Sequence, residues 1–195
     1  MGTRRHKYEF KPDRQGTHIL KKLYLTKLQR MQMLQWALYA LVCIFLLIVQ
    51  DVMLSRIRIF GATTDLVAGI ILLIGIYEGL ERGGMFVLIG STVFWFSGSA
   101  PGAYVIMLMT ALAIGATYFR QSYWRRGFAS MTFCTGIALM VYEMALFLLG
   151  LFNGQTIFSR AGVFALTGIL TWLATAALYP LVNTIAKIGG DTWKE

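Results

Sequence analysis

The sequence predicts an all-α fold, a polytopic bundle of about six transmembrane helices with both the N-terminus and the C-terminus in the cytoplasm. Three observations predict it. Of the 195 residues, 57% are hydrophobic and only 14% are charged, whereas a soluble domain carries about 25% charged residues. The apolar residues fall into six runs. The basic residues gather on the connections that such a bundle places on one side of the membrane.

The apolar runs have lengths expected for helices in a bilayer. A hydrocarbon core about 30 Å thick takes about 20 apolar residues at a rise of about 1.5 Å each. The first expected span has WALYALVCIFLLIV at its centre, and the third is short for a crossing. The six expected spans cover approximately residues 33–54, 66–80, 84–96, 102–119, 128–152 and 161–185.

The least certain boundary lies between the second and third expected spans. Only Glu81, Arg82 and two glycines separate them, so a single re-entrant hairpin over both is the alternative. The next boundary is clearer, because the run SGSAPG at residues 97–102 contains Pro101 and several turn-forming residues. Such residues break a helix sharply. We therefore expect a tight turn there, near the outer face of the membrane.

The distribution of Lys and Arg predicts the orientation. With the N-terminus inside, fifteen of the 18 basic residues fall on the cytoplasmic side, including Arg120, Arg125 and Arg126 between the fourth and fifth spans. Three fall outside, including Arg160 between the fifth and sixth spans. Since cytoplasmic segments carry the basic excess, both chain ends are expected inside. The re-entrant alternative leaves this count unchanged, so charge does not decide between the two.

The chain divides into a basic tail at residues 1–32, a transmembrane bundle at 33–188 and a short cytoplasmic C-terminus at 189–195. Nine of the 18 basic residues lie in the first 30, so most of the net charge of +9 belongs to the tail and does not indicate nucleic acid. Residues 18–35 fit an amphipathic helix that approaches anionic lipid. A plain extension of the first span is the alternative.

The residues that catalysis needs are scarce. Both histidines, His6 and His18, lie in the tail, and no GxxxxGK[ST] phosphate-binding loop occurs. Cys43 and Cys134 lie inside apolar runs, where cysteine is usually a small buried hydrophobe. We therefore expect no enzymatic activity, no cofactor and no metal. An intramembrane enzyme that uses Glu143 or Asp51 is a remote alternative.

The acidic residues are the main candidates for a site. Asp51 and Asp65 lie near span ends, as do Glu78 and Glu81, where the interface can solvate a carboxylate. Glu143 lies well inside the fifth span, where an acid costs about 2.5–3.5 kcal/mol to insert.

An acid in such a position is expected to face protein and to have a partner. Within this chain the possible partners of Glu143 are Thr171 and Thr175 on the sixth span, or Tyr104 and Thr110 on the fourth. A structural hydrogen bond, a contact with a partner or ligand, and a proton relay all remain open.

Small residues recur at a spacing of four, which lets helix backbones approach closely in lipid. Examples are Gly75 with Gly79, Gly79 with Gly83, and Ala111 with Gly115. The pattern does not distinguish packing within the chain from packing against a partner. Pro101 and Gly102 in the expected outer turn are further candidates for a structural or partner-binding role.

Three stretches resemble the rod-shape-determining MreD family. Residues 50–79, QDVMLSRIRIFGATTDLVAGIILLIGIYEG, are similar to the end of that family's first helix, a connection with Phe-Gly, and Asp-Leu at the start of the second. Residues 84–104 resemble its glycine-punctuated third helix and turn, and LYPLVNTI at 178–185 its last helix. The family often has an Asp before the turn, whereas this chain has Phe94, Trp95 and Phe96.

The resemblance implies a multi-pass protein of the bacterial inner membrane that is a non-enzymatic scaffold of the cell-elongation machinery. Its implied partners are the bitopic protein MreC, MreB-like filaments inside the cell, and the peptidoglycan glycan polymerase and transpeptidase outside. The family is also similar in fold to the S components of energy-coupling-factor transporters. The alternative function is therefore a solute-binding membrane subunit, in which Asp65, Asn153, Gln155 and Glu143 line a cavity.

Overall fold

The computed structural model describes residues 27–57, 60–123 and 127–189, and over these ranges the chain contains α-helices and 3-10 turns but no β-strand. The all-α expectation is therefore confirmed for this part of the chain. The helices are α2 (Lys27–Val52), α3 (Leu66–Glu78), α4 (Leu80–Phe96), α5 (Tyr104–Tyr123), α6 (Phe128–Phe152) and α7 (Ala161–Ile188). Short 3-10 turns, η1 (Leu54–Arg56) and η2 (Phe158–Arg160), follow α2 and precede α7.

Among the residues that the structure describes, three helical segments are long and apolar enough to cross a membrane. They cover Gln29–Val52, Phe128–Phe152 and Phe158–Ile188, with 24, 25 and 31 residues. The surface of the bundle carries large apolar side chains, such as Phe45 on α2 and Met107 on α5, which are 61% and 80% exposed. A soluble monomer rarely exposes so much apolar surface. The chain is therefore a membrane protein.

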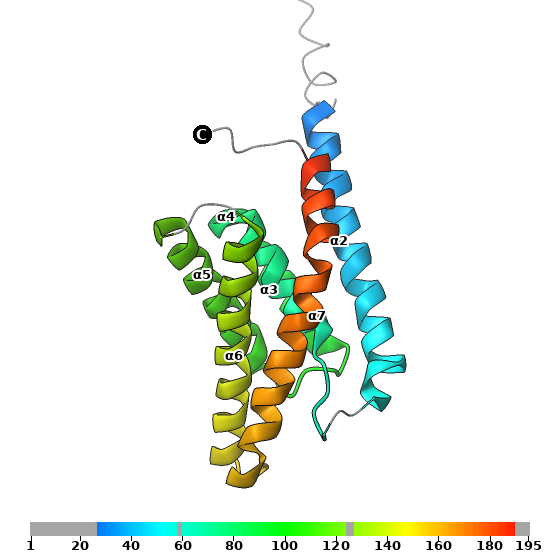
Figure 1. The fold of residues 1–195 in the computed structure, drawn as a ribbon. Helices are drawn as coiled ribbons and strands as arrows, with labels where there is room; N and C mark the ends of the chain where they lie inside the picture. The colour runs from blue at the N-terminus through cyan, green and yellow to red at the C-terminus, as the bar shows by residue number, and fades with distance from the viewer. Residues whose placement is uncertain (1–26, 58–59, 124–126, 190–195) are drawn as a thin grey trace, which may run out of the picture.

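Helix α3 lies at the centre of the bundle (Figure 1) and contacts α2, α4, α5, α6 and α7. Ile70, Leu72 and Ile74 are fully buried, and Tyr77 is its one partly exposed residue. A helix that is apolar on every side must be surrounded by protein or lipid. Here protein surrounds it, which explains why this helix of 13 residues is apolar on every side.

The turn between α3 and α4 differs from the expected one. The expected break lay around Glu81 and Arg82, but the helix ends at Glu78 and the turn is at Gly79, whose φ of 96° favours glycine. Glu81 and Arg82 form the first turn of α4 instead. The break between the two helices was predicted a few residues too late, because the prediction rested on the charged residues and not on backbone conformation.

The next turn agrees with the prediction. Helix α4 ends at Phe96 and α5 begins at Tyr104, with Gly98 at a φ of 79° in between. The Ser97 hydroxyl donates to the Phe94 carbonyl oxygen at 2.7 Å and so satisfies one carbonyl at the end of α4. The SGSAPG run therefore forms the predicted tight connection.

Helices α6 and α7 pack along much of their length, as their neighbouring ribbons show (Figure 1). The Trp172 ring covers Gly136, where a side chain would collide with the indole. The Trp172 indole N–H donates to the Thr132 carbonyl oxygen at 2.8 Å. The glycine thus lets a large aromatic ring lie flat against the neighbouring helix.

A buried polar cluster joins α2 to α3 at the end of the bundle where α2 begins. The Tyr39 hydroxyl donates to Glu78 Oε1 at 2.7 Å, and the Gln35 amide donates to the same oxygen at 2.6 Å. Glu78 is only 8% exposed, so the expectation that an interface solvates it is wrong. Two residues of α2 supply its hydrogen bonds instead.

The tail is only partly within the described residues. Residues 18–26 of the expected amphipathic helix lie outside them, as does the rest of the tail up to residue 26. From Lys27 the chain is helical without a break to Val52, two residues before the expected end of the first span. For residues 27–35 a continuous helix fits both the amphipathic helix and a plain extension of that span, so both stay predictions.

Candidate functional site

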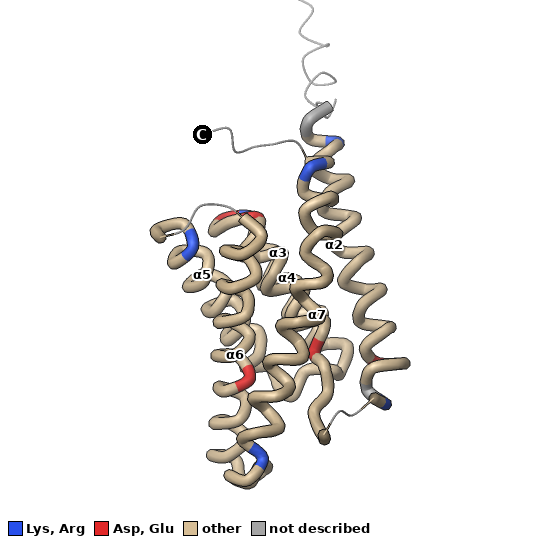
Figure 2. Tube along the Cα trace, in the orientation of Figure 1, with Lys and Arg blue, Asp and Glu red and all other residues tan. Residues whose placement is uncertain are grey.

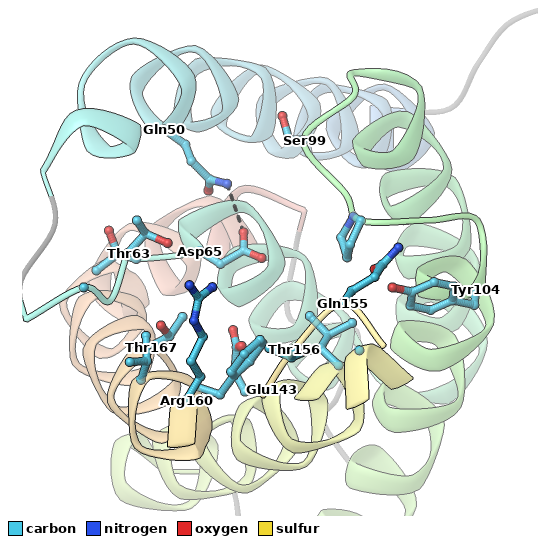
Figure 3. Close-up of a pocket in the computed structure, with 17 residues that line it drawn as sticks. Gln50, Thr63, Asp65, Ser99, Tyr104, Glu143, Gln155, Thr156, Arg160 and Thr167 are labelled. Carbon is cyan, nitrogen blue, oxygen red and sulfur yellow. Dashed lines mark hydrogen bonds between the residues drawn. The ribbon is translucent and has the colours of Figure 1, made fainter. Parts of the chain in front are cut away.

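A polar cavity of about 490 Å³ lies at the end of the bundle opposite the Glu78 cluster. Figure 3 shows the residues that line it. Segments from across the chain contribute to it: the end of α2, the loop before α3, the turn before α5, and the facing ends of α6 and α7. The lining residues are Gln50, Gly61, Thr63, Thr64, Asp65, Ser99, Pro101, Tyr104, Glu143, Leu146, Gly150, Gln155, Thr156, Arg160, Val163, Phe164 and Thr167.

Asp65 is the N-cap of α3, and hydrogen bonds fix its position. Its Oδ1 accepts from the backbone N–H of Ala68 at 3.4 Å and from the Gln50 amide at 3.0 Å. Oxygen acceptors at this position satisfy backbone N–H groups that the first helical turn leaves free. The backbone N–H of Asp65 itself donates to Thr171 Oγ1 at 2.9 Å, which joins the cap to α7.

Gln50 connects the end of α2 to the start of α3. While its amide nitrogen donates to Asp65, its Oε1 accepts from the backbone N–H of Val67 at 2.9 Å. Both ends of the side chain are therefore used. Gln50 was not among the predicted site residues, although it lies in the stretch that resembles the MreD family.

Glu143 reaches the same cavity from α6 and is only 4% exposed. Gly168 of α7 lies close against this part of α6, because a methyl group added there would meet Met140 Sδ at 2.9 Å and Glu143 Cγ at 3.4 Å. Among the described residues, no hydrogen bond or ion pair joins the Glu143 carboxyl group to another side chain. The acid is thus buried in protein and faces a cavity.

The partners expected for Glu143 mostly bond elsewhere. Thr171 accepts from Asp65, and the hydroxyl groups of Thr175 and Thr110 donate to the carbonyl oxygens of Thr171 and Ile106, each at 2.7 Å. Tyr104 is the one expected partner that lines the same cavity. A mid-helix threonine commonly donates to the carbonyl oxygen four residues earlier. This explains why the hydroxyl groups of Thr110 and Thr175 do not bond to Glu143 on α6.

Arg160 brings a positive charge to the same site. It is exposed, precedes α7, and in Figure 3 its guanidinium group extends over the cavity toward the side where Asp65 lies. Gln155 and Thr156 add neutral polar groups from the turn between α6 and α7. Figure 2 shows that Lys and Arg otherwise lie near the ends of the bundle, whereas acidic positions also occur part-way along it.

The remaining candidates from the sequence lie beside the cavity. Asp51 is exposed, and its Oδ1 accepts from the Ser99 hydroxyl at 2.9 Å, which joins the end of α2 to the turn before α5. Pro101 lines the cavity, whereas Gly102 packs against the Tyr104 ring. Asn153, expected in the solute-binding alternative, is exposed at the end of α6 and does not line the cavity.

The cavity combines two carboxyl groups and one guanidinium group with neutral donors and acceptors. Within the described ranges, no group of three or more His, Cys, Asp or Glu side chains is arranged to hold a metal ion. The arrangement can bind a small polar molecule through charge and hydrogen bonds. Asp65 and Glu143 were both predicted as site residues, and the structure places them in one cavity.

A second, apolar concavity of about 260 Å³ lies on the side of the bundle between α5 and α6. Small residues form much of it, and the space beside Gly115 is open, because a Cβ added there would meet nothing within 4 Å. The lining residues of this groove, called the α5–α6 groove, are Ala111, Leu112, Gly115, Ala116, Phe119, Cys134, Ile137, Ala138 and Val141.

No family model, curated protein or solved structure matches this sequence.

Proposed function

We propose that this protein is a non-enzymatic scaffold of the bacterial cell-elongation machinery in the inner membrane. In this role it binds a bitopic MreC-like partner and so helps to control cell shape and lateral peptidoglycan synthesis. Two observations support the proposal. One is the resemblance of residues 50–79, 84–104 and 178–185 to the MreD family. The other, which carries the geometric argument, is the α5–α6 groove.

The groove offers a surface that helix packing within this chain does not use. Several glycines inside the bundle are covered by neighbours: a side chain at Gly83 would strike the Gly75 backbone, and one at Gly136 would strike Trp172. Gly115 has no such neighbour among the described residues, yet it lies in a row with Ala111. In lipid, rows of small residues allow close helix contact. This row therefore suits a transmembrane helix of another chain.

The proposed orientation places both chain ends in the cytoplasm. The basic tail and the arginines between α5 and α6 then meet anionic lipid and MreB-like filaments. The turns before α3, before α5 and between α6 and α7 face the outside, where the glycan polymerase and transpeptidase act. The polar cavity opens on this outer side.

A leucine at Gly115 tests the scaffold function. Gly115→Leu fills the groove without a clash inside the chain, so the protein is expected to fold but to lose its partner. Gly162→Leu is the matched control, because Gly162 is also helical, exposed and without a neighbour within 4 Å of an added Cβ. The measurement is co-purification with the bitopic partner from membranes, with the cell outline as a second readout.

Depletion of the protein should turn rod-shaped cells round, and only the control variant should restore rods. Normal rods after depletion overturn the scaffold function. If Gly115→Leu and Gly162→Leu co-purify with equal amounts of the bitopic partner, the partner does not bind in the α5–α6 groove.

The cavity favours a second candidate function, a solute-binding subunit of a transporter. Asp65, Glu143 and Gln155, three of the four residues expected for this alternative, line one cavity. A volume of about 490 Å³ falls within the range of about 300–1,000 Å³ that is typical of small-molecule sites. Cross-linked complexes isolated from membranes separate the candidates, because a transporter subunit requires a nucleotide-hydrolysing partner.

A further inference from the structure

We propose that the polar cavity is a binding site for a zwitterionic compound, whose ammonium group pairs with Glu143 and whose carboxylate or phosphate group pairs with Arg160. This inference deepens the solute-binding candidate and rests on the cavity that supports it. It does not depend on the α5–α6 groove, so a scaffold protein can also have this site.

The ammonium part of the proposal follows from Glu143. Its side chain is 4% exposed and faces the cavity, and no described side chain forms a hydrogen bond or ion pair with it. A carboxyl group inside a membrane protein is normally paired. An ammonium group in the cavity supplies the missing partner, because it both donates hydrogen bonds and carries the opposite charge.

Asp65 strengthens the preference for a cation. Its Oδ1 accepts from Gln50 and from the α3 backbone, while its Oδ2 makes no hydrogen bond within the described residues. Both carboxyl groups therefore present acceptor oxygens to one space. Two carboxyl groups that line one cleft attract cationic groups and disfavour a ligand that carries only negative charge.

The anionic part follows from Arg160. Within the described residues its guanidinium group forms no ion pair with Asp65 or Glu143, although all three line the cavity. A guanidinium group matches the geometry of carboxylate and phosphate oxygens and binds them through two parallel hydrogen bonds. The site therefore keeps separate positions for a positive and a negative group, as a zwitterion requires.

The neutral lining and the volume limit the size of the ligand. Gln155, Thr156 and Thr167 provide hydrogen-bonding groups around the charged ones. A space of about 490 Å³ accommodates a small molecule or a lipid headgroup. The same chemistry has two sources: a free amino-acid-like solute, or the headgroup of an aminophospholipid.

Binding of O-phosphoethanolamine to the full-length protein in detergent tests the proposal. This probe carries both charges, whereas ethanolamine carries only the positive one and inorganic phosphate only the negative one. Calorimetry and thermal unfolding should show saturable binding that is strongest for O-phosphoethanolamine. Glu143→Gln and Arg160→Gln should each weaken it about tenfold or more, because each removes one of the two protein charges that pair with the zwitterion.

Asp51→Asn is the matched control, since Asp51 lies beside the cavity without lining it. This variant should bind O-phosphoethanolamine like the unmodified protein. Because Arg160 is exposed, its replacement tests the site even if Glu143→Gln folds poorly. Equal affinity for ethanolamine and O-phosphoethanolamine, or unchanged binding in both charge variants, overturns the proposal.

Native mass spectrometry of protein extracted from membranes distinguishes the two sources. A retained aminophospholipid that is lost in Glu143→Gln identifies the headgroup, whereas a retained small polar molecule identifies a free solute. Binding only of neutral or purely anionic solutes overturns the zwitterion proposal and leaves the solute-binding candidate intact. Failure of every small solute and aminophospholipid to bind overturns both, but not the scaffold function.

Discussion

Gly83 of α4 lies directly against the backbone carbonyl of Gly75 in α3, so closely that a Cβ at position 83 would collide with it. Neither glycine has a side chain to separate the two helices. This contact follows the turn at Gly79, whose φ of 96° reverses the chain. Together the three glycines hold α4 against the central helix.

Gly83→Ala is expected to reduce the free energy of unfolding by about 1–3 kcal/mol, because the added methyl group forces two backbones apart. Gly84→Ala is the control on the same helical turn, since its Cβ would meet only Ile114 at an ordinary 3.9 Å. The control should be neutral or stabilising by up to about 1 kcal/mol, the difference in helix propensity. Denaturation in detergent measures both, and equal effects would contradict the close contact.

The cap at Asp65 gives a second prediction. Asp65→Ala removes the oxygen that accepts from Ala68 and Gln50 and should cost about 0.5–2 kcal/mol of stability. Asp65→Asn keeps an acceptor oxygen, and Asn caps helices as well as Asp does. Its melting temperature should stay close to that of the unmodified protein. A similar loss in both variants would mean that the charge, and not the cap, stabilises α3.

The cluster around Glu78 gives a third prediction. Tyr39→Phe removes the 2.7 Å hydrogen bond to a buried carboxyl group and should destabilise the protein by about 1.5–3 kcal/mol. Tyr118→Phe on α5 is the control, because Tyr118 is 67% exposed; it should change stability by less than about 0.5 kcal/mol. If Tyr39→Phe matches the control in thermal unfolding, the cluster contributes little.

Cysteine labelling tests the proposed orientation. Starting from Cys43→Ala/Cys134→Ala, a single cysteine is introduced by Asn153→Cys after α6 or by Gly127→Cys before it. Both positions are exposed in the structure and lie at opposite ends of α6. A membrane-impermeant maleimide should label the first in intact cells and the second only after the membrane is opened. The reverse result would invert the orientation.

Much of the helix order could be predicted from the sequence. The expected span at 128–152 coincides with α6, and the predicted break at 97–102 separates α4 from α5. These elements could be predicted because their evidence is local: a long apolar run, or a proline among glycines and serines. The boundary at Gly79 could not be placed, because amino-acid composition does not show which of several nearby glycines adopts a positive φ.

The site was predicted only in part. Asp65, Pro101 and Glu143 stand out as an acid or a proline at unusual places in an apolar sequence, and all three line the cavity. Gln50 and Arg160 were not chosen, because a glutamine or an arginine at a helix end looks like ordinary surface. Their role depends on which helix ends come together. Glu78 was misjudged for the same reason, since its partners lie on α2.

The shortness of α3 has a consequence for biogenesis. Its 13 residues extend only about 20 Å at about 1.5 Å each, less than the hydrocarbon thickness of about 30 Å. A segment of that length is a poor substrate for independent release from the translocon. Its neighbours are α2, which is synthesised before it, and α4 to α7, which are synthesised after it, so the centre of the molecule is completed only when the last helices have arrived.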